Sequence, residues 1–387
     1  MARSSGPQQN YSAWDAPTLP PRLPNDATPP PPLPPELTSP LPGDAPPVPP
    51  RRKAPTTRRF ARGSMARRAL LIVLLAALLV GGLLAHRLWD FGSAISTQNP
   101  LSTQTRYMTT SDRVNLLIMG YGGGQHEAPN LTDSMIVVSI NPKDNATTMI
   151  SAPRDLWVQV PPQSGNYAKL NSAYENGLAN GYNGISASPA AGGAEAARKV
   201  SDVTGLPVQY WLTINFSGFR GLVDALGGVD VNVPVGWTAI NLGGDGLPGT
   251  GTATFKAGLQ HMDGERALQY ARARYITSPA SEGSDFARSR RQLLLIHAII
   301  DRARSLGAIP KLPSVMDALQ QTLYTNLSLA DLTLLATNAD INHAALIGLT
   351  NDNVLVDAVS DDGQDILEPA NGDWGVIQRY INARLKK

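Results

Sequence analysis

The sequence predicts an α/β fold in which a layered α/β/α domain with a central mixed sheet follows one transmembrane helix and a disordered N-terminal tail. From Val114 onward, short apolar runs typical of buried strands alternate with stretches of helical periodicity. One long apolar run precedes that region, and a proline-rich segment precedes the run. With 387 residues, the chain has room for one large domain with tails or for two average domains.

Composition excludes several classes of site. The formal net charge is +2, which argues for no particular partner, and we expect no nucleic-acid partner. Cysteine is absent, so the chain has no disulfide framework, no thiolate zinc site and no cysteine nucleophile. Neither P-loop nor dinucleotide-binding glycine spacing is present, so the sequence does not point to a nucleotide.

Residues 1–66 are expected to form a disordered, proline-rich cytoplasmic tail. This segment contains the run PPPPLPPELTSPLPGDAPPVPP and few residues able to build a core. Such a run favours the extended polyproline II conformation, which other domains can recognise. A tail that is simply flexible is the alternative, and the sequence favours it.

Residues 67–89 are expected to form the transmembrane helix. Residues 69–85 are apolar without interruption, and Trp89 suits a membrane interface. A cleaved signal peptide is disfavoured because the apolar run begins only at Ala69 and no good cleavage site follows it. Basic residues cluster on its N-terminal side, which predicts a cytoplasmic N-terminus and an extracytoplasmic domain. We therefore expect a single-pass protein of the cell membrane, with a linker over residues 90–112.

The catalytic domain is predicted over residues 113–306, and it begins with alternating strands and helices. Apolar runs between turn signals predict strands over residues 114–119, 135–140, 147–150, 209–214 and 229–233. Helical periodicity predicts helices over residues 190–204 and 216–226. Residues 237–257 are expected to be a glycine-rich loop region. Residues 307–387 are expected to be a C-terminal helical extension that packs on the same domain and ends in a helix near residues 374–385.

The arginine-rich stretch over residues 263–304 is the most informative part of the domain. Arg272 and Arg274 precede a loop, and an acid with three further arginines opens a second helical run. Ser284 is a suitable N-cap for that helix, and Asp285 is favourable in its first turn. Apolar residues at helical spacing should face the core: Phe286, Leu293, Ile296 and Ile300.

Guanidinium groups in such number repel one another unless an anion or carboxylates lie among them. The planar fork of arginine suits phosphate oxygens. Asp285, Arg288 and Gln292 follow an i, i+3, i+7 pattern and therefore share one stripe of the helix. The alternative interpretation is a solvated basic helix face.

Three further stretches contain residues suited to a site. SAPRD places Arg154 and Asp155 after a predicted strand, where α/β sheets often bind ligands, although a surface ion pair is the alternative. In GYGGGQHEAPNLTDS, glycines let backbone amides approach an anion, and His126, Glu127 and Asp133 are possible metal ligands. A generic glycine-rich hairpin loop explains the glycines equally well. In YAKLNSAYENG, Lys169 is either a phosphate contact or part of an ordinary helix start.

Together, these motifs resemble those of the LytR-CpsA-Psr family of cell-wall transferases. The resemblance runs over about residues 114–304 and rests on LLIMG, LTDSMIVVSINP, SAPRD, KLNSAYENG, GGVDVNVP, HMDGERALQYARAR and SDFARSRRQ. It implies a membrane-anchored phosphotransferase that moves a phosphate-linked glycopolymer from a polyprenyl-pyrophosphate carrier to peptidoglycan or another cell-wall acceptor, assisted by Mg²⁺. A pyrophosphatase acting on the same carrier and a non-catalytic lipid- or wall-binding anchor are the alternatives.

The resemblance also implies roles for individual residues of this sequence. Asp133 is expected to be a metal ligand, and Asp155, Asp285 and Arg288 are the expected catalytic residues, with either aspartate as the general base. Arg290 falls between motif positions and is expected outside the site. The residues expected at the phosphates are Arg154, Lys169, Arg272, Arg274, Arg288, Arg291 and Gln292.

One position departs from the pattern of the family. Many members have Gly-x-Asp after the first strand, and its carboxylate helps to hold the metal. Here the corresponding residues are Gly120, Tyr121 and Gly122, so the carboxylate is missing. Glu127 or His126, in the longer loop that follows, is the candidate replacement, and Glu127 is our predicted second metal ligand.

Overall fold

The computed structural model describes residues 62–97, 113–124, 126–240, 251–305 and 310–385. The expected tail up to residue 61 and linker residues 98–112 lie outside this range, as do residues 241–250 of the glycine-rich region. The chain divides into two units, Met1–Met65 and Ala66–Lys387. Apart from the first residues of one helix, the second unit contains all the sheets and helices discussed below.

Helix α1, Arg62–Ile95, contains the predicted transmembrane segment. Its part Leu70–Ile95 is long and apolar enough to cross a membrane. The helix does not end near Trp89 as expected but continues to Ile95. Phe91 and Ile95 are buried in a cluster with Met316 of α7 (Leu312–Leu319). The last turns of α1 therefore belong to the folded part of the second unit rather than to a linker.

A mixed sheet of six strands forms the centre of the described structure. Its order is β12-β6-β1-β2-β3-β13, in which β1–β6 and β3–β13 are parallel pairs and the other neighbours are antiparallel. The strands are β1 (Val114–Tyr121), β2 (Thr132–Ile140), β3 (Ala146–Ser151), β6 (Tyr210–Asn215), β12 (Leu323–Thr325) and β13 (Asp340–Gly348). The expected central mixed sheet is thus confirmed, and β1, β2, β3 and β6 lie where apolar runs predict strands.

Alternation along the strands supplies a core on each face of the sheet. Leu117 and Met119 of β1 join one cluster, whereas Leu116 and Ile118 join the other. The first cluster is covered by α2 (Ser172–Asn180), α3 (Pro189–Thr204) and α9 (Trp374–Leu385). The second is covered by α6 (Asp285–Arg304) and α8 (Leu329–Asn338). Helices on both faces confirm the layered α/β/α arrangement.

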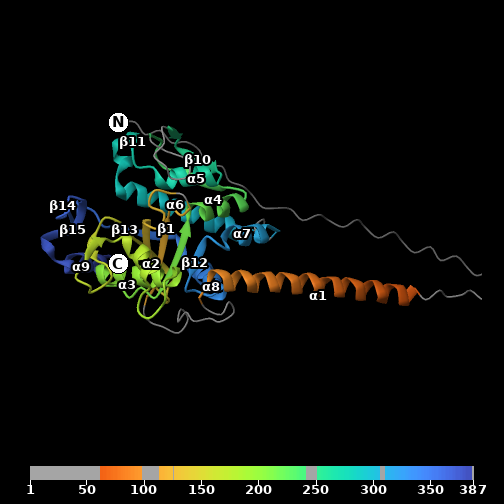
Figure 1. The fold of residues 1–387 in the computed structure, drawn as a ribbon. Helices are drawn as coiled ribbons and strands as arrows, with labels where there is room; N and C mark the ends of the chain where they lie inside the picture. Colours follow the sequence, from red (N-terminus) through yellow and green to blue (C-terminus); the bar gives the residue numbers. More distant parts are fainter. Residues whose placement is uncertain (1–61, 98–112, 125, 241–250, 306–309, 386–387) are drawn as a thin grey trace, which may run out of the picture. The chain divides into compact units, whose positions relative to one another are not determined.

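A smaller core holds the elements that lead into the arginine-rich stretch. In Figure 1, α4, α5, β10 and β11 gather at one end of the central sheet. Strands of the glycine-rich region complete this part, around Val231, Trp237, Phe255 and Tyr270. Its elements are α4 (Phe216–Ala225), β7 (Val229–Val233), β8 (Trp237–Ala239), β9 (Ala253–Phe255), β10 (Gly258–Met262), α5 (Gly264–Arg272), β11 (Ile276–Ser278) and the 3-10 turn η2 (Ala280–Gly283).

The C-terminal extension is not only helical, in contrast to the prediction. It supplies β12 and β13, which form the two edges of the central sheet. It also forms a hairpin of β14 (Leu355–Val359) and β15 (Asp365–Pro369), followed by the turn η4 (Ala370–Gly372). The short β12 and the polar residues of β13 give little strand signal, which explains the difference. Two short strands, β4 (Trp157–Gln159) and β5 (Tyr167–Lys169), are likewise absent from the prediction.

Candidate active site

The first charged group of the site lies where β2 begins and β3 ends. These strands are antiparallel neighbours, so Asp133 near the start of β2 and Arg154 just after β3 lie at the same end of the sheet. The Arg154 guanidinium donates to the Asp133 carboxylate, and its Nε lies 3.3 Å from Oδ2 of Asp155. Nζ of Lys169, in β5, lies 3.3 Å from Oδ1 of Asp155. Carboxylates and cations thus alternate through four side chains, which we call the ion network.

The ion network lies partly open to solvent. Its four side chains are between 25% and 30% exposed, which leaves them accessible to a ligand. Burial acts to lower the pKa of Arg154, but the carboxylates of Asp133 and Asp155 outweigh it and the pKa is raised. Arg154 therefore stays positively charged at the edge of the sheet.

Arg272, the last residue of α5, interacts electrostatically with the same carboxylate. The pKa of Arg272 is lowered, first by burial and further by repulsion from Arg220 and Arg274, while Asp133 and Glu265 act to raise it. Its guanidinium carbon lies 4.4 Å from the ring centre of Phe216, at the start of α4. Arg154 and Arg272 thus share one nearby carboxylate, and an anion would relieve the repulsion among the arginines.

Helix α6 reaches the site with its first turns. Its predicted N-cap is confirmed, because Oγ of Ser284 accepts a hydrogen bond from the Ala287 amide at 3.1 Å. Gln292 accepts from Oγ of Ser134 at 2.9 Å and so joins α6 to β2. Half-buried Arg288 precedes Gln292 by four residues and lies on the same stripe of the helix. The backbone of Asp285 opens the helix, but its side chain lies outside the described part of the structure.

Arg291 is placed differently from the sequence prediction. Its side chain is 1% exposed and donates to the carbonyl oxygens of Tyr270, Ala273 and Glu282 at 3.1, 2.6 and 2.7 Å. Burial lowers its pKa to about 10. The predicted phosphate contact is therefore wrong for Arg291, because all its nitrogens are used inside the protein. The residue ties α6 to the end of α5 and to η2.

Two neighbouring residues of α6 also lie outside the site. Arg290 pairs with the buried carboxylate of Glu282, so its exclusion from the site agrees with the structure. Leu293, Ile296 and Ile300 pack against the core as predicted. Phe286, however, is 44% exposed, and the prediction that it faces the core is wrong. It lies in the first turn of the helix, beside Gly348 at the end of β13.

The glycine-rich loop after β1 shows where the missing carboxylate would lie. A Cβ atom added at Gly122 would lie only 2.5 Å from Cγ of His126, so the imidazole fills the space of a side chain there. The Ala128 amide donates to Nδ1 of His126 at 3.2 Å, which assigns the proton of a neutral ring to Nε2. That tautomer presents a hydrogen-bond donor rather than a metal ligand. Glu127, the predicted second metal ligand, is exposed.

A cavity of about 400 Å³ adjoins the ion network. It reveals residues that the sequence analysis missed: the aromatic rings of Trp157 and Tyr167 and, from the tip of the β14–β15 hairpin, Asp362 and Gln364. The sequence around the two aromatic residues gives a weak strand signal, since each begins a short segment in which inward-facing and outward-facing residues alternate. No local pattern indicates Asp362 or Gln364, because about two hundred residues separate them from Arg154.

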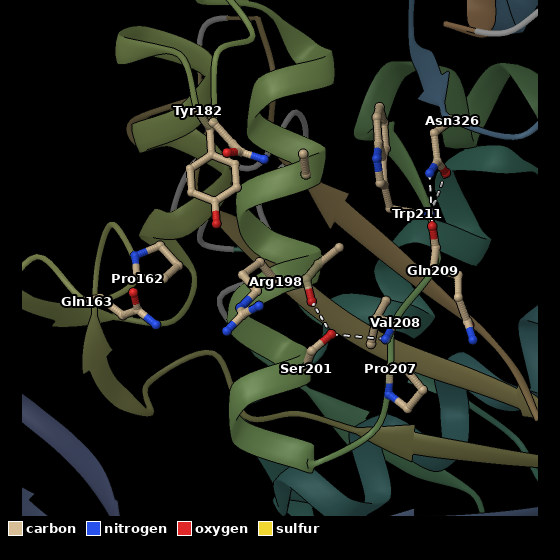
Figure 2. A pocket seen from close by; sticks show the side chains of 13 residues that line it. Pro162, Gln163, Tyr182, Arg198, Ser201, Pro207, Val208, Gln209, Trp211 and Asn326 are labelled. Atoms are coloured by element: carbon tan, nitrogen blue, oxygen red, sulfur yellow. Dashed lines mark hydrogen bonds between the residues drawn. The ribbon is translucent and has the colours of Figure 1, made fainter.

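A larger cavity, of about 590 Å³, lies elsewhere. Figure 2 shows it along α3 and the start of β6, with Tyr182 and Arg198 among its lining side chains. Ser201 and Asn326 are engaged there by backbone hydrogen bonds, from the Val208 and Trp211 amides at 2.9 Å each. This cavity lies at the beginning of β6. Phe216 follows the other end of that strand, and Arg272 lies against its ring, so the cavity and the charged residues are at opposite ends of β6. Size alone therefore does not mark the site.

Comparison with known proteins gives one family. The family model described as LytR_cpsA_psr matches residues 89–369. The polyisoprenyl-teichoic acid–peptidoglycan teichoic acid transferase TagV of Bacillus subtilis is 28% identical over 275 residues, 68% of this chain and 65% of that protein. A transferase of the same description, TagU of Enterococcus faecalis, is 29% identical over 271 residues, 67% of this chain and 78% of that protein. The match thus spans slightly less than two-thirds of TagV.

A solved structure supports the same assignment. Protein gbs0355 from Streptococcus agalactiae superposes with a TM-score of 0.55 and 28% identity, over 74% of this chain and 92% of that one. Its likeness agrees with the mixed sheet and the covering helices. Since the family model covers well over half of the sequence and includes the ion network, Arg272 and the start of α6, the chain belongs to the LytR-CpsA-Psr family.

Proposed function

We propose that this protein is a membrane-anchored phosphotransferase that moves a phosphate-linked glycopolymer from a polyprenyl-pyrophosphate carrier to peptidoglycan or another cell-wall acceptor. The names of the TagV and TagU relatives describe transfer of this kind. The observation that carries the proposal is that Arg154 pairs with Asp133 while Arg272 interacts electrostatically with the same carboxylate. Positive charge gathered beside an accessible cavity suits a pyrophosphate.

In the proposed reaction, a hydroxyl oxygen of the acceptor forms a bond to the phosphorus that bears the polymer. The bond from that phosphorus to the bridging oxygen breaks, and polyprenyl phosphate leaves. Arg154, Lys169, Arg272, Arg274 and Arg288 would stabilise the charge that develops on the phosphate oxygens. The hydroxyl proton would pass to a carboxylate, for which Asp155 and Asp285 are the proposed bases.

We also propose that Mg²⁺ assists the reaction. Over the described residues, no group of three His, Asp or Glu side chains lies close enough to hold a metal ion. Asp133 fits the mode in which one or two carboxylates and the substrate phosphates hold Mg²⁺ together. Bound in this way, the ion would neutralise part of the pyrophosphate charge.

The topology of the chain in the membrane belongs to the same proposal. The apolar part of α1 supports a single membrane crossing. Basic residues precede it, from Arg51 to Arg68, which supports a cytoplasmic N-terminus and an extracytoplasmic domain. Labelling cysteines introduced at Ser4 and at exposed Asp361 with an impermeant reagent in intact cells would test it. Labelling only at position 361 is expected. Labelling only at position 4 would show the reverse orientation, with the N-terminus outside and the domain in the cytoplasm.

Turnover of a polyprenyl-pyrophosphate-linked disaccharide by the full-length chain in detergent micelles tests the activity. Transfer that requires added peptidoglycan fragments supports the proposal. Phosphate release without an acceptor would indicate a pyrophosphatase, and binding without turnover would indicate a non-catalytic anchor.

Replacement of the site arginines tests how the substrate is held. Arg154→Ala, Arg272→Ala and Arg288→Ala are each expected to lower kcat/KM roughly a hundredfold, because each removes a charge that stabilises the phosphate oxygens. Arg379→Ala is the matched control, since Arg379 of α9 is 70% exposed and pairs with Asp373, just before that helix. Unchanged kcat/KM in the site variants would contradict the proposed phosphate contacts.

A further inference from the structure

The ribbon formed by β4 and β5 presents an unusual face beside the ion network. Trp157 pairs with Lys169 and Gln159 pairs with Tyr167, with Val158 and Ala168 between them. Val158 is buried and Ala168 packs against the same core, so they mark the inner face of the ribbon. Because side chains alternate along a strand, the other pairs occupy the outer face. That face carries Lys169 and Trp157, then Gln159 and Tyr167.

The aromatic residues of this face are not required by the core. The rings of Trp157 and Tyr167 lie 6.4 Å apart, with an interplanar angle of 25°, and Tyr167 is 54% exposed. Nε2 of Gln159 lies 3.2 Å from the Tyr167 hydroxyl and holds the ring in place. A stacked aromatic pair that stays accessible next to charged groups suits a ligand with an apolar face.

A second wall of the cavity comes from the tip of the β14–β15 hairpin. The Leu367 amide donates to the carbonyl oxygen of Asp155 at 2.9 Å, so the hairpin is joined directly to the ion network. Asp362 and Gln364 line the cavity from this tip. Nε2 of Gln364 donates to Asp362 at 2.7 Å, which orients the amide and leaves its oxygen as an acceptor. The wall thus presents acceptors to hydroxyl groups.

We propose that this cavity is a saccharide pocket that holds one pyranose unit directly beside the bound phosphates. A pyranose offers an apolar face to Tyr167 and Trp157 and hydroxyl groups to Asp362 and Gln364. The volume of about 400 Å³ lies within the usual range for small-ligand sites. A prenyl chain fits less well, because it would desolvate the charged groups of Asp362 and Lys169 and leave the Gln364 amide oxygen without a donor. The proposal rests on the phosphotransferase function and specifies its substrate.

Both substrates of the proposed reaction contain sugars, and two measurements distinguish them. The donor places its first sugar next to the pyrophosphate, and the acceptor places its hydroxyl-bearing sugar next to the reacting phosphorus. For the donor, calorimetry on the full-length chain in detergent micelles compares farnesyl pyrophosphate with farnesyl pyrophosphate carrying one N-acetylglucosamine. For the acceptor, the KM for peptidoglycan fragments is measured at saturating donor.

A donor sugar in the pocket predicts that the glycosylated probe binds about tenfold more tightly than the sugar-free probe. Tyr167→Ala and Gln364→Ala are then expected to remove this difference and leave the affinity for the sugar-free probe unchanged. Tyr167→Phe should keep the difference, because the ring remains. Leu259→Ala is the matched control, since Leu259 is 74% exposed on β10, away from the pocket.

An acceptor sugar in the pocket predicts equal affinities for the two donor probes and, in Tyr167→Ala, a severalfold higher acceptor KM. The pocket is overturned if Tyr167→Ala and Gln364→Ala change neither the sugar-dependent affinity nor the acceptor KM while the sugar-free probe still binds. Failure of the wild-type chain to bind farnesyl pyrophosphate at all would instead overturn the phosphotransferase function, and the pocket proposal with it.

Discussion

The arginines in and around the site differ in what their guanidinium groups contact. Arg154 and Arg272 lie near one partly exposed carboxylate, whereas Arg291 is enclosed by backbone carbonyl groups. An arginine whose nitrogens all donate to buried backbone carbonyls holds elements together, whereas one beside a partly exposed carboxylate can also contact a ligand. The two kinds should respond differently to mutation.

Arg291→Ala is expected to destabilise the domain by on the order of 3 kcal/mol, because it leaves three buried carbonyl groups without a donor. Guanidinium chloride unfolding, followed by tryptophan fluorescence, measures the effect. Arg379→Ala should change the unfolding free energy little, since that arginine forms an exposed ion pair. Normal stability together with lost farnesyl pyrophosphate binding would instead place Arg291 in the phosphate site.

Gly122→Asp is expected to impair turnover, because its Cβ atom would meet the His126 ring. Adding His126→Ala removes the conflict and lets the new carboxylate act with Asp133. Turnover should return, with half-saturation at roughly tenfold lower Mg²⁺ concentration than in the His126→Ala control, since a second carboxylate strengthens Mg²⁺ binding. A Mg²⁺ titration of turnover measures this, and identical curves for the control and the double variant would refute it.

Among the elements, α6 links the layers of the domain to the site. Its apolar stripe packs on the central sheet. Gln292 contacts Ser134 near the start of β2 at 2.9 Å, and Ser289 contacts Ser151 at the end of β3 at 2.7 Å. Arg291 ties the same helix to the end of α5. The position of Arg288 therefore depends on how α6 begins and on what it packs against.

Ser284→Ala should cost about 1 kcal/mol of stability, because the Ala287 amide loses its cap. The first turn of α6, which precedes Arg288, should then fray. Amide hydrogen exchange over residues 285–289 measures the local effect, and denaturant unfolding measures the global one. Ser284→Asp keeps a capping oxygen and should behave like the wild type. Equal protection in the alanine variant would show that the cap is not needed.

At the scale of the whole molecule, the C-terminal extension completes both the sheet and the site. It supplies β12 and β13, one at each edge of the central sheet. It also supplies the hairpin whose tip lines the saccharide pocket. The residues after position 306 are thus part of the domain rather than an appendage to it.

Truncation after Ser305 is expected to prevent stable folding, because it exposes the edges of β6 and β3 and removes α8 and α9 from the two faces of the sheet. Circular dichroism and size-exclusion chromatography of the truncated chain in detergent micelles should show lost structure or aggregation. A truncated chain that stays monodisperse and unfolds cooperatively would show that the domain folds without the residues after position 305.

Residues that follow a strong local signal lie together in the structure as their motifs predict. Asp133, Arg154 and Lys169 belong to motifs next to strands, and the structure brings all three into one network. Arg291 was misassigned because a buried and an exposed arginine look alike in a motif. Phe286 has helical spacing, but the first turn of α6 lies beyond the packed part of the core.

The sequence by itself determined the apolar helix, the layered α/β/α class, the Ser284 cap and the family, since these depend on periodicity, local hydrogen bonds and short motifs. Only the tertiary structure decided which arginines face a ligand, what occupies the space at Gly122, and that Asp362 and Gln364 meet Tyr167 beside the ion network. These features depend on burial and on contacts between residues as much as two hundred positions apart, which no local pattern encodes.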